Sequence, residues 1–551
     1  CSFSAIIFVL IFVAVVLIVQ PSFLKHEFSL LRGENISKVN HKSELKEDNS
    51  TESTPPPTTT PIIETTTQDK EHIVIQTKLG KIRGRLSNQL GIDLSTFLGV
   101  PYAKPPQGKL RFKRTVPLKP WEDTMNALEL PSPCYQPLYT QKLFPVKILN
   151  YNISEDCLYL NIWAPINHEE PLPVLIFIHG GMFTVGSVGV DEYDGGILAA
   201  YGNAVVVTIQ YRLGIFGFLD LNTTTIPGNQ GLWDQAMAIK WVYENIDNFG
   251  GDPNSITLFG QSAGAISIGL HMISDFSKNL FKRVIMQSGS PMLLNPVYTK
   301  GEEVSEMFAE KVGCLSEGVM LEEAYELVSK CIHNLPFQKI VDVQQEMVKN
   351  NPVPFMPTIP TEYVDTFPSQ AINDYYNETE IKQKDFLLGF NLNDGNLILH
   401  LAYPELYSRF QVPNITTLEQ AKESMTKMSV DGGFPETQAK AMASVFLHGN
   451  ETDTPENFAN KMGSALGDLM FVCPTIKLSD KLFKLGKNVH MYLFSHRAYN
   501  SVWGKWMGVT HHDEINLVFG LPLRYPYLYH GDDIDLSKRI MKTWTYFAKT
   551  G

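Results

Sequence analysis

Two continuous apolar runs give the clearest secondary-structure signals in the chain. LPVLIFIHGG (residues 172–181) and AVVVTIQYRLG (residues 204–214) are rich in β-branched residues and lack polar alternation. That pattern is typical of strands buried on both faces. EHIVIQTKLGKIRGR (residues 71–85) instead alternates on either side of Leu79 and Gly80, and this alternation predicts a hairpin.

Segments with helical spacing alternate with these strands. LWDQAMAIKWVYENIDNF (residues 232–249) has helical spacing and is followed by two glycines, a fitting stop. SITLFGQSAG (residues 255–264) then predicts another strand, and AISIGLHMI (residues 265–273) predicts a helix. Strands alternating with helices predict one α/β domain with a large, mostly parallel central sheet flanked by helices.

The N-terminal part of the chain has a different composition. Residues 1–22 are nearly all apolar, which fits either a cleaved signal peptide or an uncleaved anchor of about 20 residues. The absence of a small-x-small cleavage site before QPSFLKHEF favours the anchor. Residues 23–71 include a Ser-, Thr- and Pro-rich stretch typical of an extended stalk. The expected globular domain is therefore residues 72–551.

Charge and cysteine usage exclude some classes of function. The 551 residues carry a formal net charge of −12, which argues against nucleic-acid binding. None of the six cysteines stands in a CxxC pair or beside a histidine at zinc-finger spacing. We therefore expect no metal site.

Glycosylation sequons indicate an extracellular or luminal location. Seven N-x-S/T sequons are more than a chance match would suggest and predict passage through the secretory pathway. The sequons begin at Asn35, Asn49, Asn152, Asn222, Asn377, Asn414 and Asn450. In that oxidising compartment Cys134 and Cys157 are expected to form one local disulfide. Cys314 and Cys331 are expected to form another, and Cys473 has no obvious partner.

The segment GQSAG (residues 260–264) carries the first candidate for chemistry. It fits G-x-S-x-G, in which small neighbours leave room for a sharp strand-to-helix turn that holds the serine in a strained conformation. A glycine-bracketed serine can also be an ordinary turn. The predicted strand before it and helix after it favour Ser262 as a nucleophile, with the N–H of Ala263 at the helix N-terminus.

A second glycine motif supplies candidate donors for an oxyanion. IFIHGGMF (residues 176–183) ends a predicted strand in two glycines, and backbone N–H groups in such a loop can stabilise developing negative charge. Gly180 and Gly181 can also form a simple turn. Their position upstream of the serine favours an oxyanion loop in which Gly181 and Met182 donate together with Ala263.

A serine nucleophile needs a general base and an acid that orients it. MGVTHHDEINLVFG (residues 507–520) offers His511 and His512, and the pattern alone does not separate them. Adjacent histidines are also usual in solvated loops. LLGFNLNDGNLIL (residues 387–399) offers Asp394 after an apolar run, although Asn-Asp-Gly is also a turn signal.

These motifs together resemble the type-B carboxylesterase/cholinesterase family of α/β-hydrolases, from about Ile73 to Gly551. FLGVPYAKPPQGKLRFKR is similar to the family's N-terminal segment, and SEDCLYLNIWAP is one of its most specific signatures. NQGLWDQAMAIKWVYENIDNFGGDP and KTWTYFAKTG also match. The resemblance implies an α/β-hydrolase fold in which Ser262 is the nucleophile, Asp394 the acid and His511 the general base.

The resemblance also implies the scaffold around the site. The pairs 134–157 and 314–331 resemble the family's first two disulfide loops. Cys473 stands where the family has a cysteine that pairs with one near the C-terminus, in a part of the relatives that lies beyond FAKTG. Two ion pairs of the scaffold are implied as well: Arg111 with Glu155, and Arg212 with Asp234.

Four departures from the family pattern bear on the substrate. Gln261 stands where cholinesterases have Glu, Asp394 where animal members commonly have Glu, and Met182 where a Gly or small residue is usual. A backbone donor at Met182 requires its side chain to point away from the acyl pocket. The loop 134–157 has no Trp, whereas cholinesterases place one there for cation–π binding of choline.

The sequence therefore predicts a serine carboxylic-ester hydrolase that acts through an acyl-enzyme on small to medium esters, with no metal or organic cofactor. One alternative is a membrane-tethered adhesion protein of the same fold, with a protein partner in place of a substrate. The anchor and stalk favour this alternative, and the intact Ser262, Asp394 and His511 oppose it. A cholinesterase is a further alternative, opposed by the missing Trp.

Overall fold

The structure is a computed structural model in which the chain divides into a first unit, residues 1–60, and a second, compact unit, residues 61–551. The described residues all belong to the second unit: 71–137, 149, 152–293, 301–316, 318–350, 355–358, 381, 384–411, 414–431, 434–447 and 453–551. The predicted segments 1–22 and 23–71 lie outside them, apart from Glu71. Of the helices in the described ranges, none has the length and apolar character needed to cross a bilayer.

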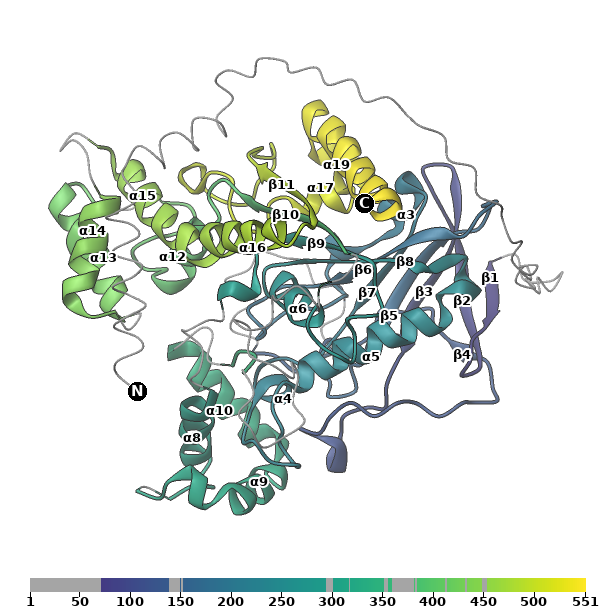
Figure 1. Ribbon diagram of the computed structural model, residues 1–551, viewed down its shortest axis with the longest axis horizontal. Coiled ribbons are helices and arrows are strands. Elements are labelled where there is room, and N and C mark those ends of the chain that lie inside the picture. The colour runs from purple at the N-terminus through teal and green to yellow at the C-terminus, as the bar shows by residue number, and fades with distance from the viewer. Residues whose placement is uncertain are drawn as a thin grey trace. The chain divides into compact units, whose positions relative to one another are not determined.

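An 11-stranded sheet forms the centre of the second unit (Figure 1). The strand order is β1-β2-β3-β5-β7-β6-β8-β9-β10-β11, and β4 pairs with β2. The strands are β1 (His72–Gln76), β2 (Lys81–Gln89), β3 (Ile92–Pro101), β4 (Met125–Asn126), β5 (Tyr159–Pro165), β6 (Leu172–Ile178), β7 (Val205–Ile209), β8 (Gly251–Gln261), β9 (Arg283–Gln287), β10 (Asp385–Asn391) and β11 (Asn488–Phe494).

The sheet is mixed, with one continuous run of parallel strands at one end and a separate parallel pair, β2 with β4. Neighbouring strands from β7 through β6, β8, β9 and β10 to β11 are parallel, whereas the neighbours from β1 to β7 through β2, β3 and β5 are antiparallel. The predicted α/β architecture is confirmed. So is the hairpin, because β1 and β2 pair from His72 opposite Arg85 to Gln76 opposite Lys81.

Strand β6 shows why its sequence lacks alternation. Its residues point in turn to opposite faces of the sheet, as strand geometry requires. Val174 and Ile176 join the larger hydrophobic cluster, and Leu175 and Phe177 join a second cluster. Both faces are covered, so every position of the strand is apolar.

Helices cover the two faces of the sheet and extend beyond it (Figure 1). The α-helices are α3 (Gly196–Gly202), α4 (Gly214–Phe218), α5 (Gln230–Asn245), α6 (Ala263–His271), α8 (Gly301–Lys311), α9 (Tyr325–His333), α10 (Phe337–Asn350), α12 (Gly395–Ala402), α13 (Leu418–Asp431), α14 (Glu436–Phe446), α15 (Pro455–Gly467), α16 (Cys473–Lys484), α17 (Ile515–Val518), α18 (Leu521–Arg524) and α19 (Gly531–Thr550). Helix α5 continues as a 3-10 turn to Phe249 and ends at Gly250, whose φ is 83°. The predicted helix and its glycine stop are thus confirmed.

Helices α12 to α15 form a separate group, which we call the helical cap (Figure 1). Their apolar residues make a third hydrophobic cluster. Trp503, Trp506 and Met507, from the segment before α17, complete this cluster. The cap therefore packs around residues that lie only a few positions before His511.

Both expected disulfides are bonded in the structure, Cys134–Cys157 and Cys314–Cys331. Cys473 is exposed and is the free cysteine of the described residues. Among the described sequon residues, Asn152 and Asn414 are exposed and Asn222 is partly buried. Asn35, Asn49, Asn377 and Asn450 lie outside the described residues.

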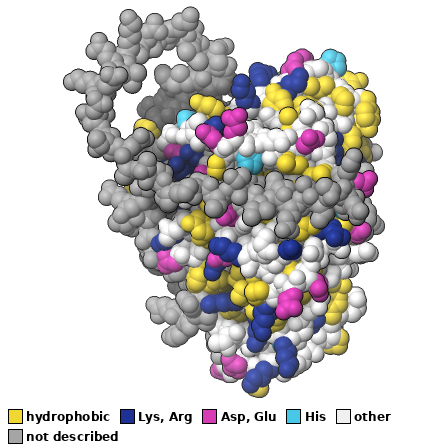
Figure 2. Space-filling model, turned by 90° about the vertical axis from the view of Figure 1, so that its right-hand side faces the viewer, with side chains coloured by type: hydrophobic (Ala, Val, Ile, Leu, Met, Phe, Trp, Pro, Cys, Tyr) yellow, Lys and Arg dark blue, Asp and Glu magenta, His cyan; other side chains and the backbone are white. Residues whose placement is uncertain are grey.

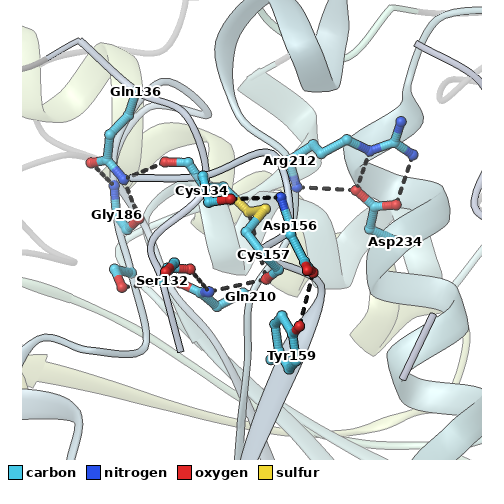
Figure 3. The surroundings of a disulfide bond; sticks show 12 residues. Ser132, Cys134, Gln136, Asp156, Cys157, Tyr159, Gly186, Gln210, Arg212 and Asp234 are labelled. Carbon is cyan, nitrogen blue, oxygen red and sulfur yellow. Dashed lines mark hydrogen bonds and ion pairs between the residues drawn. A yellow bond between two sulfur atoms is a disulfide. The ribbon is translucent and has the colours of Figure 1, made fainter. Parts of the chain in front are cut away.

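The two implied ion pairs are also present. Arg111 Nε lies 2.6 Å from Glu155 Oε1. Arg212 donates to Asp234 through its backbone N–H at 3.0 Å and through Nε and Nη2 at 2.7 Å each (Figure 3). The Arg212 and Asp234 side chains are almost fully buried. Each buried charge is therefore stabilised by the opposite charge of its partner.

The substitution Asp234→Asn is expected to destabilise the fold by about 3–5 kcal/mol, because it leaves the Arg212 charge buried without a counter-charge. Urea unfolding of the protein with its disulfides intact measures the change. Lys240→Ala is the control, since the Lys240–Glu244 pair is exposed and should leave the unfolding midpoint in place. A loss below about 1 kcal/mol in Asp234→Asn would contradict the expectation.

Candidate active site

The candidate residues gather where parallel strands end. Strand β6 ends at Ile178, β8 at Gln261 and β10 at Asn391. Ile178 lies opposite Gly260 in the pairing of β6 with β8. Parallel strands end at one edge of a sheet, and in open α/β sheets ligands bind outside that edge.

Ser262 stands at the turn between β8 and α6. Its backbone has φ 57° and ψ −122°, a conformation that costs a residue with a side chain of order 1–3 kcal/mol. The turn is tight because a Cβ at Gly264 would lie 1.9 Å from the Ile178 carbonyl oxygen, and one at Gly260 would lie 2.8 Å from it. The Ser262 N–H donates to the Gln287 carbonyl oxygen on β9 at 2.8 Å, which holds the strained residue.

The loop after β6 has an equally unusual backbone. Gly181, Met182 and Phe183 all have positive φ, at 110°, 57° and 56°. The N–H groups of Thr184 and Val185 both donate to the Gly181 carbonyl oxygen, at 3.0 and 2.9 Å. Within the described part of the chain, the N–H groups of Gly181, Met182 and Ala263 have no acceptor.

This loop lies against the serine. A Cβ at Gly180 would lie 3.0 Å from the Ser262 Cβ. Met182 is partly buried, and its side chain packs against the apolar cluster of the helical cap. The Met182 side chain thus packs against the helical cap, and the backbone N–H of Met182 remains free to donate.

The first disulfide loop braces the same segment (Figure 3). Gln136 Nε2 donates to the Gly186 carbonyl oxygen at 2.9 Å, and the Gly186 N–H donates to Gln136 Oε1 at 3.1 Å. A Cβ at Gly186 would lie 2.3 Å from His179 Nδ1. Burial lowers the pKa of His179 to about 4, so this histidine is neutral and serves as a packing residue of the loop.

Asp394 and His511 meet through two asparagines that join distant segments. The Asn393 N–H donates to the Val509 carbonyl oxygen at 2.8 Å, and Asn391 Nδ2 donates to the Thr510 carbonyl oxygen at 2.9 Å. His511 Nδ1 consequently lies 2.8 Å from Asp394 Oδ1.

The contacts of Asp394 decide the tautomer of His511. Asp394 Oδ2 accepts the Asn391 N–H at 2.8 Å, so both oxygens of this buried side chain are engaged. A carboxylate only accepts, so the Nδ1 of His511 carries a proton, and in the neutral imidazole the lone pair is on Nε2.

Two further residues contact the His511 ring. Gln261 Nε2 lies 3.0 Å from His511 Nε2. The ring of Phe471 stacks on the imidazole, with centroids 4.4 Å apart and planes 25° apart. Phe471 belongs to a one-turn π-helix, Asp468–Val472, a feature often found at functional sites.

His512 has a different environment. Its Nε2 lies 3.0 Å from the Tyr193 hydroxyl. Burial and the neighbouring His511 lower the pKa of His512 to about 3. The structure thus brings His511, and not His512, to Asp394.

A buried glutamate, Glu514, follows in the same segment. Glu514 is buried and accepts from Gln287 Nε2 at 3.0 Å and from Asn391 Nδ2 at 2.6 Å. Burial, with the Asp394 charge second, raises the pKa of Glu514. Glu514 therefore ties the ends of β9 and β10 to the segment that carries His511.

Sequence reasoning missed the contacts made by Phe471, Glu514 and Gln261. Glu514 has a weak sequence signal, an acid directly before the apolar run INLVFG. Gln261 stood out only as a departure from a family pattern. Phe471 has no signal, because its contact with His511 depends on how the π-helix packs.

On the face shown in Figure 2, basic and acidic side chains are interspersed with hydrophobic and uncharged ones over the described residues. In the described part of the chain, no group of three His, Cys, Asp or Glu side chains is arranged to hold a metal ion.

Comparisons with known proteins match most of the chain. The model of the carboxylesterase family matches residues 71–551. Acetylcholinesterase of Leptinotarsa decemlineata is 35% identical over 526 residues, covering 89% of this chain and 81% of that protein. Acetylcholinesterase of Bungarus fasciatus is 34% identical over 493 residues, covering 87% of this chain and 78% of that protein.

The side chain of Asp513, next to Glu514, predicts how the stability of the fold depends on pH. Burial raises the pKa of Asp513 to about 7, although the Thr510 N–H and Arg497 oppose the shift. The folded protein therefore binds this proton more tightly than the unfolded chain, and the stabilisation is complete below a pH of about 4 and lost as the pH rises to about 7. Asp513→Asn keeps an oxygen that accepts the Thr510 N–H but has no proton to lose. The substitution should therefore reduce the loss of folding stability with rising pH.

Melting temperatures at pH 5 and pH 8 test the expectation. The Asp513→Asn protein should lose less stability between the two pH values than the wild type does. Asp535→Asn, at a side chain that is 75% exposed, should follow the wild type. Equal slopes for Asp513→Asn and wild type would show that Asp513 is not the group responsible.

Proposed function

The chain belongs to the carboxylesterase family of serine ester hydrolases, and from that premise we propose that it hydrolyses small to medium carboxylic esters through an acyl-enzyme. Ser262 is the nucleophile, His511 the general base and Asp394 the acid that orients the base. The N–H groups of Gly181, Met182 and Ala263 stabilise the oxyanion, with Gly180 in the same loop.

One observation carries the proposal: the 2.8 Å bond between His511 and Asp394, next to a serine with φ 57°. An adhesion surface requires neither a buried carboxylate–imidazole pair nor a strained serine. Backbone strain persists where the surrounding structure enforces it, and such strain clusters at active sites. The pair and the strained serine lie at the same edge of the sheet, after β10 and β8.

Acylation follows from these contacts. His511 Nε2 takes the proton of the Ser262 hydroxyl as Oγ attacks the ester carbonyl carbon. The carbonyl oxygen becomes an oxyanion and accepts from the backbone N–H groups of the loop and of Ala263, each worth roughly 10²–10³ in rate. The C–O bond to the alcohol then breaks, and the alcohol leaves with the proton that His511 held.

Deacylation reverses the roles. Water gives a proton to His511 Nε2 and attacks the acyl carbon, and the bond to Ser262 Oγ breaks as Oγ regains the proton. Throughout, Asp394 holds the imidazole in its Nδ1-protonated tautomer and stabilises the imidazolium. The reaction needs no metal or organic cofactor.

We propose neutral esters as the preferred substrates. The loop 134–157 has no Trp for cation–π binding of a quaternary ammonium, although the acetylcholinesterases named above are relatives of this chain. Two disulfides and seven sequons support an extracellular or luminal location. Tethering by residues 1–22 remains part of the proposal, and a protein partner belongs only to the adhesion alternative.

The substitution Ser262→Ala is expected to reduce kcat for p-nitrophenyl butyrate by about 10⁶, and His511→Gln by a similar factor. Asp394→Asn should cost about 10⁴, because the imidazole adopts the wrong tautomer. The measurement uses the secreted glycosylated domain at several pH values. His512→Gln is the matched control, since His512 contacts Tyr193 rather than Asp394, and it should retain turnover.

Two outcomes would contradict the assignment. Equal loss in His511→Gln and His512→Gln, with both proteins folded, would remove His511 as the base. A folded wild-type protein without serine-dependent turnover on this and other esters would make the adhesion alternative the leading one.

Selectivity for the alcohol is a separate prediction. The value of kcat/KM for 3,3-dimethylbutyl thioacetate should equal or exceed that for acetylthiocholine, its cationic analogue of similar shape. The two substrates share the acetyl group, so their ratio reports only the quaternary charge. A preference of more than about tenfold for acetylthiocholine would indicate a cation site and favour the cholinesterase alternative.

A further inference from the structure

The Nε2 atom of His511 has an unexpected neighbour. Gln261 Nε2 lies 3.0 Å from it, and Nδ1 of the same ring is engaged by Asp394 at 2.8 Å. Both side chains are buried, with 1% of Gln261 and 5% of His511 exposed. The Gln261 amide therefore donates to the single lone pair of the neutral imidazole.

Strand geometry aims Gln261 at His511. Residues of β8 alternate between the two faces of the sheet: Leu258 belongs to the larger hydrophobic cluster and Phe259 to the second. Gln261 follows Phe259 by two positions and so shares its face. Helix α17, directly after His511, packs into that second cluster, so the two side chains approach from facing elements.

The Gln261 amide and the His511 ring each have one close neighbour. A Cβ at Gly180 would lie 2.6 Å from Gln261 Oε1, so the glycine leaves room for the amide oxygen. Phe471 stacks on the ring of His511, which keeps the imidazole in one plane. The contact thus lies between the glycine loop, which leaves space for the amide oxygen, and Phe471 of the π-helix, which packs on the imidazole.

We propose that Gln261 is a positioning residue that keeps His511 neutral between turnovers and gives up Nε2 to the Ser262 hydroxyl when an ester binds. The inference rests on the proposed function, in which Nε2 must accept the Ser262 proton. Two donors cannot both use one lone pair, so the Gln261 donor and the serine hydroxyl compete. After proton transfer, Nε2–H is a donor, and Gln261 assists only by turning its amide oxygen toward it.

A glutamate at this position would act in the opposite sense. A carboxylate has no donor, so it would leave the lone pair of Nε2 to Ser262. It would also favour the imidazolium, because an opposite charge within hydrogen-bond distance raises the pKa of a histidine. The identity of residue 261 therefore sets the protonation of the base.

Other ionisable groups surround the ring and stay constant between variants. The nearest acid is Asp394, in contact with Nδ1, and the Glu514 charge also interacts with the imidazole. The remaining groups on the elements around the ring are Asp513, Arg497, His512, Asp468 and His179.

The experiment measures the pKa of His511 by NMR in the folded protein labelled with [13Cε1, 15N]-histidine, with the signal assigned by its loss in His511→Gln. Gln261→Glu should raise the pKa of His511 by about one to three units, and the pH of half-maximal kcat/KM should move upward with it. Gln107→Glu adds the same charge at an exposed glutamine and should leave the pKa unchanged.

A second variant covers the case in which Gln261→Glu does not fold. Gln261→Met has no donor, so in a Ser262→Ala background, where no serine hydroxyl can take its place, the 15N resonance of the unprotonated Nε2 should move downfield relative to Ser262→Ala alone. A His511 pKa that is the same in Gln261→Glu and Gln107→Glu, or an Nε2 resonance unmoved in Gln261→Met, overturns the inference. The NMR readouts need no turnover, so they decide the role of Gln261 even if Ser262 proves inactive on esters.

Discussion

The strained turn at Ser262 is the constraint on which the rest of the site depends. Helix α6 begins directly after β8, and its first turn lies so close to β6 that a Cβ at Gly264 would lie 1.9 Å from the Ile178 carbonyl oxygen. The close packing forces φ 57° on Ser262 and lets α6 begin at once with Ala263. A larger residue at 264 would separate helix from strand and remove both features together.

The partners of the serine come from segments far apart in the sequence. Asp394 follows β10, His511 precedes α17, and backbone and side-chain bonds from Asn391 and Asn393 join the two segments. Glu514 adds a buried link to β9 and β10 through Gln287 and Asn391. Because these bonds are buried, the imidazole is positioned by the scaffold before any substrate arrives, and little reorganisation is left for the reaction.

A buried site of this kind controls protonation through its neighbours. Asp394, Asp513 and Glu514 lie within one polar network, and burial raises the pKa values of the last two. The base shares this environment and has a neutral amide, rather than a carboxylate, at Nε2. Under the role proposed for Gln261, a change at residue 261 alone shifts the pH range in which the proposed base works, while Ser262, Asp394 and His511 stay the same.

The sequence by itself determined the strands β6, β7 and β8, the hairpin of β1 and β2, helix α5 with its glycine stop, and the disulfide pairs, because local periodicity and family motifs encode them. It also pointed to Ser262 and the glycine loop, because each of these motifs is made of residues that are adjacent in the sequence. It did not separate His511 from His512 without a family comparison, and it gave no sign of Phe471. Those distinctions depend on which side chains meet across loops more than 100 positions apart, and only tertiary packing decides that.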